Sequence, residues 1–252
     1  MIGARLRALW ATLLERLIGA ALPGIMRRAL RRGLAGIWSK TEAPVRVDSV
    51  SVADGSAVFD GSAVFDGGAV VVANHHSWWD AYLAWAVADR HGRPSGAIMD
   101  DAQLARFRFF RHVGAVSDRE PRAAARRAAA GAWLFVYVEG ELRPPGPLGP
   151  ARPGAAAVAR WAGVPVLPLA IRCVMRGGER PEVYLLFGAP LASGVDHETL
   201  VRTLAALLER LDRDLAAAQA AEAPVPGYDP WWPTAGRSHE RLARWRAWWG
   251  AP

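Results

Sequence analysis

The sequence predicts an α/β domain in which a mostly buried, mixed sheet is flanked by helices. Four apolar segments, rich in β-branched or aromatic residues, have the length of buried strands: 69–73, 133–138, 164–171 and 183–187. Stretches with helical spacing separate them, near 78–91, 101–112, 120–131 and 152–162. Strands that alternate with helices are typical of α/β folds, and 252 residues are enough to bury one substantial core.

The N-terminal 40 residues predict a basic helical hairpin. Apolar residues recur at helical spacing over 4–21 and again over 25–38, on either side of Pro23 and Gly24. Residues 1–40 hold eight basic side chains against one acidic, which accounts for the whole net charge of +7. Such a hairpin is suited to an anionic membrane surface. An ordinary amphipathic pair packed on the core is the alternative.

No apolar run approaches the roughly 18–20 residues that span a bilayer. The chain has one cysteine, Cys173, which excludes an internal disulfide and a cysteine-based zinc site and favours a reducing compartment. We therefore expect a peripheral protein at the cytoplasmic face of the cell membrane, with membrane lipids as partners. No nucleic-acid partner is expected, because the basic residues are confined to the N-terminus.

Three further segments complete the organisation. Residues 54–70 repeat DGSAVF, DGSAVF and DGGAVV, a period that suits a short strand meander with Asp-Gly turns. A long helix is expected from Asp196 to about residue 222, and a short one over 238–250. The predicted units are thus 1–40, a central α/β domain over 41–222, and a tryptophan- and arginine-rich tail over 223–252. That tail is either a membrane-interface anchor or a segment packed on the domain.

The stretch NHHSWWD follows the first buried strand and carries the main candidate site. Residues five apart on one helix point about 140° from each other, so His75 and Asp80 converge only if His75 precedes the helix. Ser77 and Asp80 form a capping-box-like pattern that would start the helix at Ser77. Asp80 would then hold His75 as a general base for a hydroxyl, with His76 as the fallback.

Two other interpretations of this stretch stay open at the level of the residues. Asp80 caps the helix and the histidines only satisfy backbone groups, or His75, His76 and Asp80 bind a metal. The metal reading is the weaker one, because no further ligands follow at a recognisable spacing.

The order of four motifs resembles the phospholipid/glycerol acyltransferases, which include the 1-acylglycerol-3-phosphate acyltransferases. The first motif of that family, Asn-His, four residues and Asp, is matched in full by Asn74, His75 and Asp80. The second runs from a glycine through apolar residues into Asp-Arg. It is matched by GAVSDRE, which contains Arg119.

The third family motif, Pro-Glu-Gly-Thr-Arg, is only partly matched by FVYVEGELR. Glu139 and Gly140 are present, Glu141 replaces the threonine, and Arg143 falls one place late. The fourth motif, an apolar Val-Pro-x-x-Pro strand, appears as VPVLPLAI, and VYLLFGAPL resembles a later family strand. The resemblance covers about residues 68–192 and implies a glycerol-phosphate-acyltransferase-like fold.

The resemblance implies direct acyl transfer without a cofactor or a metal. His75 would take the proton of an acceptor hydroxyl as it attacks the thioester of acyl-CoA or acyl-carrier protein, the co-substrate, and Asp80 would stabilise the imidazolium. The family pattern assigns substrate binding to five residues: Asn74, Arg119, Glu139, Gly140 and Arg143. Backbone N–H groups near Ser77, or around Glu139 and Gly140, are expected to hold the oxyanion.

Lysophosphatidic acid is the acceptor that the resemblance favours. Glu141 adds a negative charge where a phosphate would lie, so a lipid alcohol or glycolipid without phosphate is the alternative acceptor. A non-catalytic membrane-binding protein that keeps the fold is a further alternative. A hydrolase is disfavoured, because the chain has no Gly-x-Ser-x-Gly elbow. The sequence predicts no oligomeric state.

Overall fold

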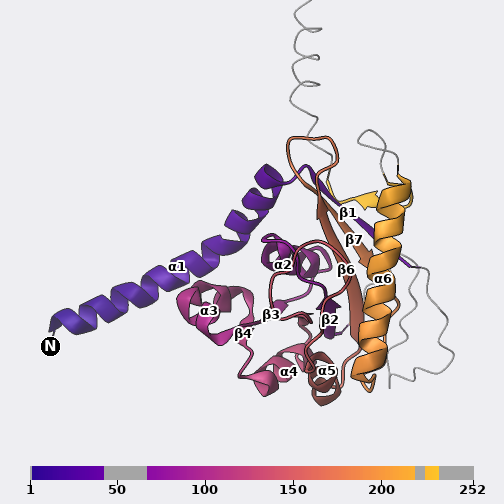
Figure 1. The fold of residues 1–252 in the computed structure, drawn as a ribbon. Coiled ribbons are helices and arrows are strands. Elements are labelled where there is room, and N and C mark those ends of the chain that lie inside the picture. Colours follow the sequence, from indigo (N-terminus) through magenta and orange to yellow (C-terminus); the bar gives the residue numbers. More distant parts are fainter. Residues whose placement is uncertain (1, 43–66, 219–224, 233–252) are drawn as a thin grey trace, which may run out of the picture.

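Eight strands pair into one sheet in the order β4-β3-β5-β2-β6-β7-β1-β8 (Figure 1). The computed structural model describes residues 2–42, 67–218 and 225–232. The strands are β1 Gly36–Thr41, β2 Ala69–Ala73, β3 Ser95–Met99, β4 Ala115–Ser117, β5 Trp133–Tyr137, β6 Val166–Val174, β7 Glu182–Phe187 and β8 Asp229–Pro230. The helices are α1 Ile2–Gly33, α2 Asp80–Arg90, α3 Asp101–Arg106, the 3-10 helix η1 Arg108–Val113, α4 Pro121–Ala129, α5 Ala155–Ala162 and α6 His197–Ala217.

The sheet is mixed, as predicted. Strands β4, β3, β5, β2 and β6 are parallel, β7 runs antiparallel to β6, β1 is parallel to β7, and β8 is antiparallel to β1. The four strands predicted from apolar runs are confirmed as β2, β5, β6 and β7. The parallel strands share one carboxyl edge, where the loops that follow them meet.

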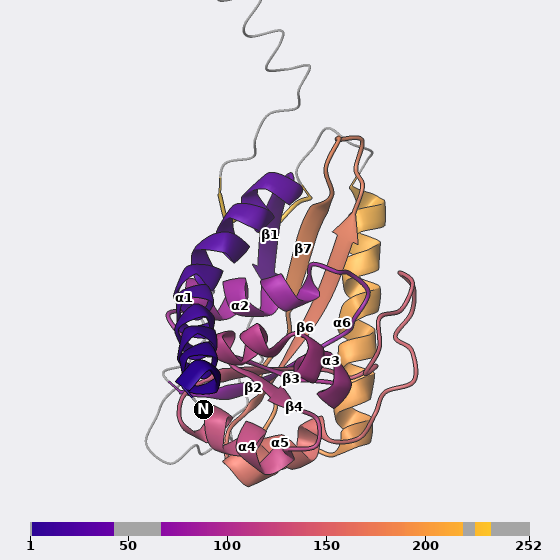
Figure 2. The ribbon, with the colours of Figure 1, turned by 90° about the vertical axis from the view of Figure 1, so that its left-hand side faces the viewer.

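Helices cover both faces of the sheet, which explains why its central strands are apolar throughout. In β2, Ala69, Val71 and Ala73 join the core beneath α1 and α2, whereas Val70 and Val72 join the core beneath α4, α5 and α6. Viewed from the side of α1, the strands lie between α1 and α6 (Figure 2). The apolar stripe of α6 is buried as expected from its spacing: Leu200, Leu204, Leu207, Leu208 and Leu211.

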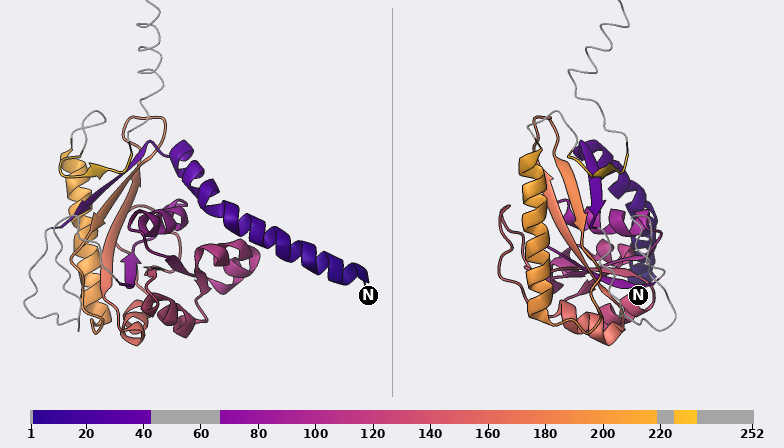
Figure 3. Two further views of the ribbon diagram at one scale, coloured as in Figure 1. Left: turned by 180° about the vertical axis from the view of Figure 1, so that it is seen from behind. Right: turned by 90° about the vertical axis from the view of Figure 1, so that its right-hand side faces the viewer.

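The predicted N-terminal helical hairpin is wrong, because α1 is one helix that continues through Pro23. Its N-terminal part runs away from the sheet (Figure 3). Proline normally ends or kinks a helix, since it lacks an N–H and crowds the preceding turn. Here buried contacts on both sides offset that loss: Leu22, Met26 and Leu30 all lie in the core shared with α2 and the sheet.

Residues 36–41, expected to be helical as far as residue 38, form the strand β1 instead. Its parallel pairing with β7 gives Ile37 and Trp38 a fully buried place, and Trp38 stacks on Tyr184 at 5.2 Å between ring centroids. Long-range pairing of this kind overrides local helical periodicity. Residues 22–41 therefore belong to the same core as the sheet, as in the alternative interpretation of a packed amphipathic segment.

Two predicted segments lie outside the described residues: most of the repeat over 54–70, and the helix over 238–250. Within the part of the chain that is described, no helix has both the length and the apolar character that crossing a bilayer requires.

Candidate active site

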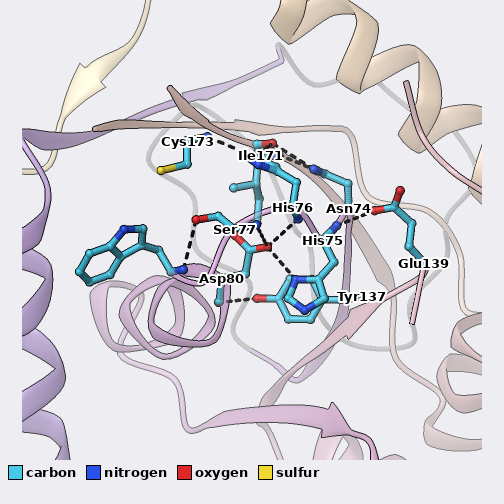
Figure 4. Close-up of polar contacts among 10 residues, drawn as sticks. Asn74, His75, His76, Ser77, Asp80, Tyr137, Glu139, Ile171 and Cys173 are labelled. Carbon is cyan, nitrogen blue, oxygen red and sulfur yellow. Dashed lines mark hydrogen bonds and ion pairs between the residues drawn. The ribbon is translucent and has the colours of Figure 1, made fainter. Parts of the chain in front are cut away.

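Three neighbouring parallel strands bring the site together at the carboxyl edge of the sheet. Asn74 and His75 follow β2, Glu139 follows β5, and Ile171 and Cys173 lie on β6, which pairs with β2 (Figure 4). The carboxyl ends of parallel strands are the usual location of sites in α/β folds. The first and third motifs therefore meet in one place, although His75 and Glu139 are 64 residues apart in sequence.

His75 and Asp80 form a hydrogen-bonded pair, with 2.7 Å between Nδ1 and Oδ2. Asp80 is fully buried, whereas the side chain of His75 is 26% exposed. A carboxylate acceptor at Nδ1 favours the tautomer that carries its proton there, which leaves Nε2 as the basic nitrogen. The predicted approach of the two side chains is confirmed, and the arrangement suits proton abstraction by His75 from a group outside the protein.

The local turn differs from the predicted capping box, because α2 begins at Asp80 and not at Ser77. Asp80 Oδ2 reaches back and accepts the backbone N–H groups of His76 and Ser77, both at 3.0 Å. The carboxylate thus organises the turn before the helix, and this turn is what places His75 outside the helix. Asp80 Oδ1 is buried and has no hydrogen-bond partner among the described atoms.

Tyr137 is a site residue that the sequence reasoning missed. Its ring stacks on His75 with 4.6 Å between centroids, and its hydroxyl donates to the backbone carbonyl of Asp80 at 2.5 Å. Burial raises the pKa of Tyr137 well above its ordinary value, so the phenol stays protonated and donates. The only sequence signal was its place two residues before Glu139, on a strand that ends at the site.

Glu139 holds the backbone of the site. Its Oε2 accepts the N–H of His75 at 2.7 Å, its Oε1 accepts the N–H of Gly149 at 2.9 Å, and the residue is buried. Gly140 adopts a φ of +67°, and an added Cβ would lie 2.6 Å from the side chain of Arg152, so glycine is needed in this turn. In this structure both carboxylate oxygens of Glu139 bind backbone N–H groups of the protein, and the contact of Glu139 with substrate stays a prediction.

Asn74 extends the sheet with its side chain. Its amide nitrogen donates to the carbonyl of Ile171 at 3.1 Å, and its amide oxygen accepts the N–H of Ile171 at 2.8 Å. The residue is only 2% exposed. Asn74 thus ties the end of β2 to β6 directly before His75. The contact of Asn74 with substrate, which the resemblance implies, also stays a prediction.

His76 faces away from its neighbour His75 and contacts β6. Its Nε2 lies 3.1 Å from the carbonyl of Ile171 and 3.2 Å from the N–H of Cys173. Burial lowers the pKa of His76 below its ordinary value, and the field of Asp80 only partly opposes this. A neutral, enclosed ring is a poorer candidate for the base than His75. Burial also raises the pKa of the Cys173 thiol, which keeps it neutral.

The two arginines expected to bind substrate are each paired with an acid. Arg143 Nη2 binds Glu141, which is 56% exposed, and the Arg143 backbone N–H donates to the carbonyl of His75 at 2.9 Å. Arg119 is 79% exposed and lies 3.6 Å from Asp101. Arg119 follows β4, three strand positions from β2, or about 14 Å across the sheet at the usual strand spacing.

Arg172 is the second residue that the sequence reasoning missed. It is buried on β6, pairs with Asp212 of α6 through two bonds of 2.6 and 2.7 Å, and donates to the carbonyl of Gly146 at 2.6 Å. This fork anchors the loop whose Gly149 N–H binds Glu139. An internal arginine within an apolar strand was the available signal.

The expected oxyanion donors are already in use. The N–H of Ser77 donates to Asp80, and the N–H of Gly140 donates to the carbonyl of Tyr137 at 3.0 Å. These two N–H groups are engaged within the protein in this arrangement, and an oxyanion donor near Ser77 or around Glu139 and Gly140 stays a prediction. Within the described residues, no group of three His, Cys, Asp or Glu side chains is arranged to hold a metal ion.

The comparisons with known proteins agree with this geometry. Residues 57–172 match the family model Acyltransferase. This stretch of the chain therefore matches an acyltransferase domain, which supports the resemblance to the phospholipid/glycerol acyltransferases seen in the four motifs.

The fold is similar to that of the 1-acyl-sn-glycerophosphate (LPA) acyltransferase PlsC from Thermotoga maritima, with a TM-score of 0.51 and 21% identity. That match covers 81% of this chain and 82% of the other. Among curated proteins, none matches this chain in sequence.

Proposed function

We propose that the chain is a peripheral membrane O-acyltransferase that transfers a fatty acyl group from acyl-CoA or acyl-carrier protein to the hydroxyl of a lipid. The observation that carries the proposal is the His75–Asp80 pair, in which a buried carboxylate fixes Nδ1 and the ring remains partly exposed. No serine or cysteine nucleophile is needed, since a thiolate is a good leaving group.

In the proposed step, His75 Nε2 takes the proton of the acceptor hydroxyl while the hydroxyl oxygen attacks the thioester carbonyl. The C–S bond then breaks, the acyl group stays on the acceptor oxygen as an ester, and the thiolate leaves. Asp80 stabilises the imidazolium during attack, and the proton on His75 can pass to the departing sulfur. Tyr137 and Glu139 keep the ring and its backbone in place.

Lysophosphatidic acid is the acceptor we propose first. The T. maritima enzyme of similar fold is named for this substrate, and the ion pair with Arg143 neutralises the charge of Glu141 that argued against a phosphate. The strand spacing also suits a phosphate held by Arg119, because a long arginine side chain shortens the distance from β4 to His75.

A lipid alcohol without phosphate is the second candidate. The observation that favours it is that Arg119 and Arg143 each already face a carboxylate, and Leu142 stands next to Arg143 with 55% of its surface exposed. A phosphate would have to compete with Asp101 and Glu141 for these cations.

The test is mass spectrometry of the lipids formed by purified protein from one acyl-CoA and a panel of acceptors: lysophosphatidic acid, monoacylglycerol and a glycolipid. Thiol release that depends on the acceptor supports a transferase, whereas release without an acceptor indicates hydrolysis. His75→Ala is the control for chemistry that does not use the site. No product from any acceptor would contradict the proposal.

A further inference from the structure

Large apolar side chains are exposed in only a few places among the residues whose side chains are described. Three lie on α1, and three lie on loops at the carboxyl edge of the sheet. The exposed set is Leu17, Ile18, Ile25, Trp78, Leu142, Met175 and Trp161. Soluble surfaces rarely cluster such residues without a partner. Only Trp161, on α5, lies elsewhere.

The three at the carboxyl edge follow three adjacent strands. Trp78 follows β2, Leu142 follows β5 and Met175 follows β6, and these strands are neighbours in the sheet. Their exposed fractions are 65%, 55% and 62%. We call these three residues the apolar rim.

The apolar rim lies on three segments that contact His75 or its neighbours. Trp78 is three residues from His75 in the turn that Asp80 organises. Leu142 precedes Arg143, whose N–H binds the carbonyl of His75. Met175 is two residues from Cys173, whose N–H contacts His76. The exposed apolar side chains therefore lie on the segments that build the site and not on a distant element.

Trp78 is held in place although it is exposed. Its ring contacts Trp79 at 5.2 Å and Tyr82 at 4.8 Å between centroids. Trp79 in turn packs against Gly33, where an added Cβ would lie 2.2 Å from the indole. An indole fixed with one polar and one apolar side is typical of the membrane interface.

Cations from α1 lie beside this surface. Arg180, on the loop that begins with Met175, donates to the backbone carbonyls of Arg31 and Arg32 at 3.3 and 3.1 Å. The side chains of Arg28, Arg31 and Arg32 are exposed at this end of α1. Cations beside exposed apolar residues match an anionic headgroup layer above acyl chains, and this charge pattern selects a bilayer over a second copy of the chain.

We propose that the apolar rim inserts into a lipid bilayer, so that the opening to His75 lies at the membrane surface and the basic end of α1 contacts the headgroups. This inference rests on the proposed function, in which the acceptor is a membrane lipid. Beyond the proposed function, the inference specifies which face of the molecule binds the membrane and which three side chains insert. A lipid hydroxyl would then reach His75 without leaving the bilayer.

The test is sedimentation of the full chain with vesicles of phosphatidylcholine and phosphatidylglycerol at 1 M salt, where the Debye length is about 3 Å and charge attraction is screened. The triple variant Trp78→Ser, Leu142→Ser, Met175→Ser is expected to partition at least tenfold more weakly than the wild type. Trp161→Ser is the matched control, with a similar exposed indole at the other edge of the sheet, and should bind as the wild type does.

Hydrogen exchange of the wild-type chain on the same vesicles gives a measurement that needs no variant. Protection should appear at 77–79, 141–143 and 174–176 and not at 160–162. Unchanged partitioning of the triple variant would overturn the proposal, and so would an equal weakening of partitioning by Trp161→Ser. Protection that needs no vesicles and appears at high protein concentration would also overturn it, because it would indicate contact between copies of the chain. Neither measurement uses turnover, so a failure of the proposed reaction would be seen separately in the acceptor panel.

Discussion

Asp80→Asn isolates the charge of the proposed catalytic pair, His75 and Asp80, with little change of shape. All three hydrogen bonds to the Asp80 side chain end on Oδ2, from His75, His76 and Ser77. An asparagine oxygen in that position can still accept them, and its amide nitrogen takes the place of Oδ1, which has no partner. The substitution therefore removes the negative charge and keeps the orientation of His75.

The expected loss follows from the geometry. The charges of imidazolium and carboxylate lie about 4 Å apart, which corresponds to about 4 kcal/mol at an effective dielectric of about 20. Solvent at the partly exposed His75 reduces this, so we expect kcat to fall about 100- to 1,000-fold, at about 1.4 kcal/mol per factor of ten. The KM for acyl-CoA should change little, because Asp80 is fully buried.

The assay is thiol release from acyl-CoA with the acceptor present, measured for wild type, Asp80→Asn and Asp89→Asn. Asp89 lies on the same helix in an exposed pair with Arg27, so its neutralisation should leave kcat within about twofold. A folded Asp80→Asn protein with kcat within threefold of the wild type would refute the role assigned to Asp80. An equal loss in both variants would show a general effect of charge on α2.

The remaining predictions concern the neighbours of this pair. His75→Ala should abolish transfer in a folded protein and His76→Ala should lower it less than tenfold; the reverse order of rates would identify His76 as the base. Tyr137→Phe keeps the stacked ring but loses the bond to Asp80, so kcat should fall about fivefold, the equivalent of about 1 kcal/mol, with KM unchanged, and a change confined to KM would contradict this. Glu141→Thr releases its paired arginine and should raise the use of lysophosphatidic acid over monoacylglycerol about fivefold; an unchanged ratio would place the pair outside the acceptor site. Burial lowers the pKa of His76 and of His91, so the unfolded chain binds more protons, and the free energy of unfolding should fall below about pH 6.5, by at most about 1.4 kcal/mol per pH unit for each histidine. Urea unfolding at pH 5 and pH 7.5 measures this, and a stability that rises at low pH would contradict it.

The elements that the sequence predicted well are those whose pattern is local. The runs at 69–73 and 133–138 are apolar because both faces of β2 and β5 are covered, and that is visible in the residues alone. The strand β1 was mistaken for helix, since Ile37 and Trp38 fit either period and only pairing with β7 decides between them. The predicted helix break at Pro23 also came from a local rule. Packing of α1 against distant parts of the chain overrode that rule, and the helix continues through the proline.

In the site, the sequence by itself determined the pairing of His75 with Asp80, at a spacing that works only across a turn, and placed it in motifs whose order resembles the acyltransferases. Only the tertiary structure decided what surrounds the pair. Tyr137 and Glu139 reach it because parallel strands share one carboxyl edge, and strand order cannot be read from residues distant in sequence. For the same reason the structure alone showed that Asn74 binds β6 and that exposed apolar residues lie on the segments after three adjacent strands, because both depend on which strands become neighbours and not on any local pattern.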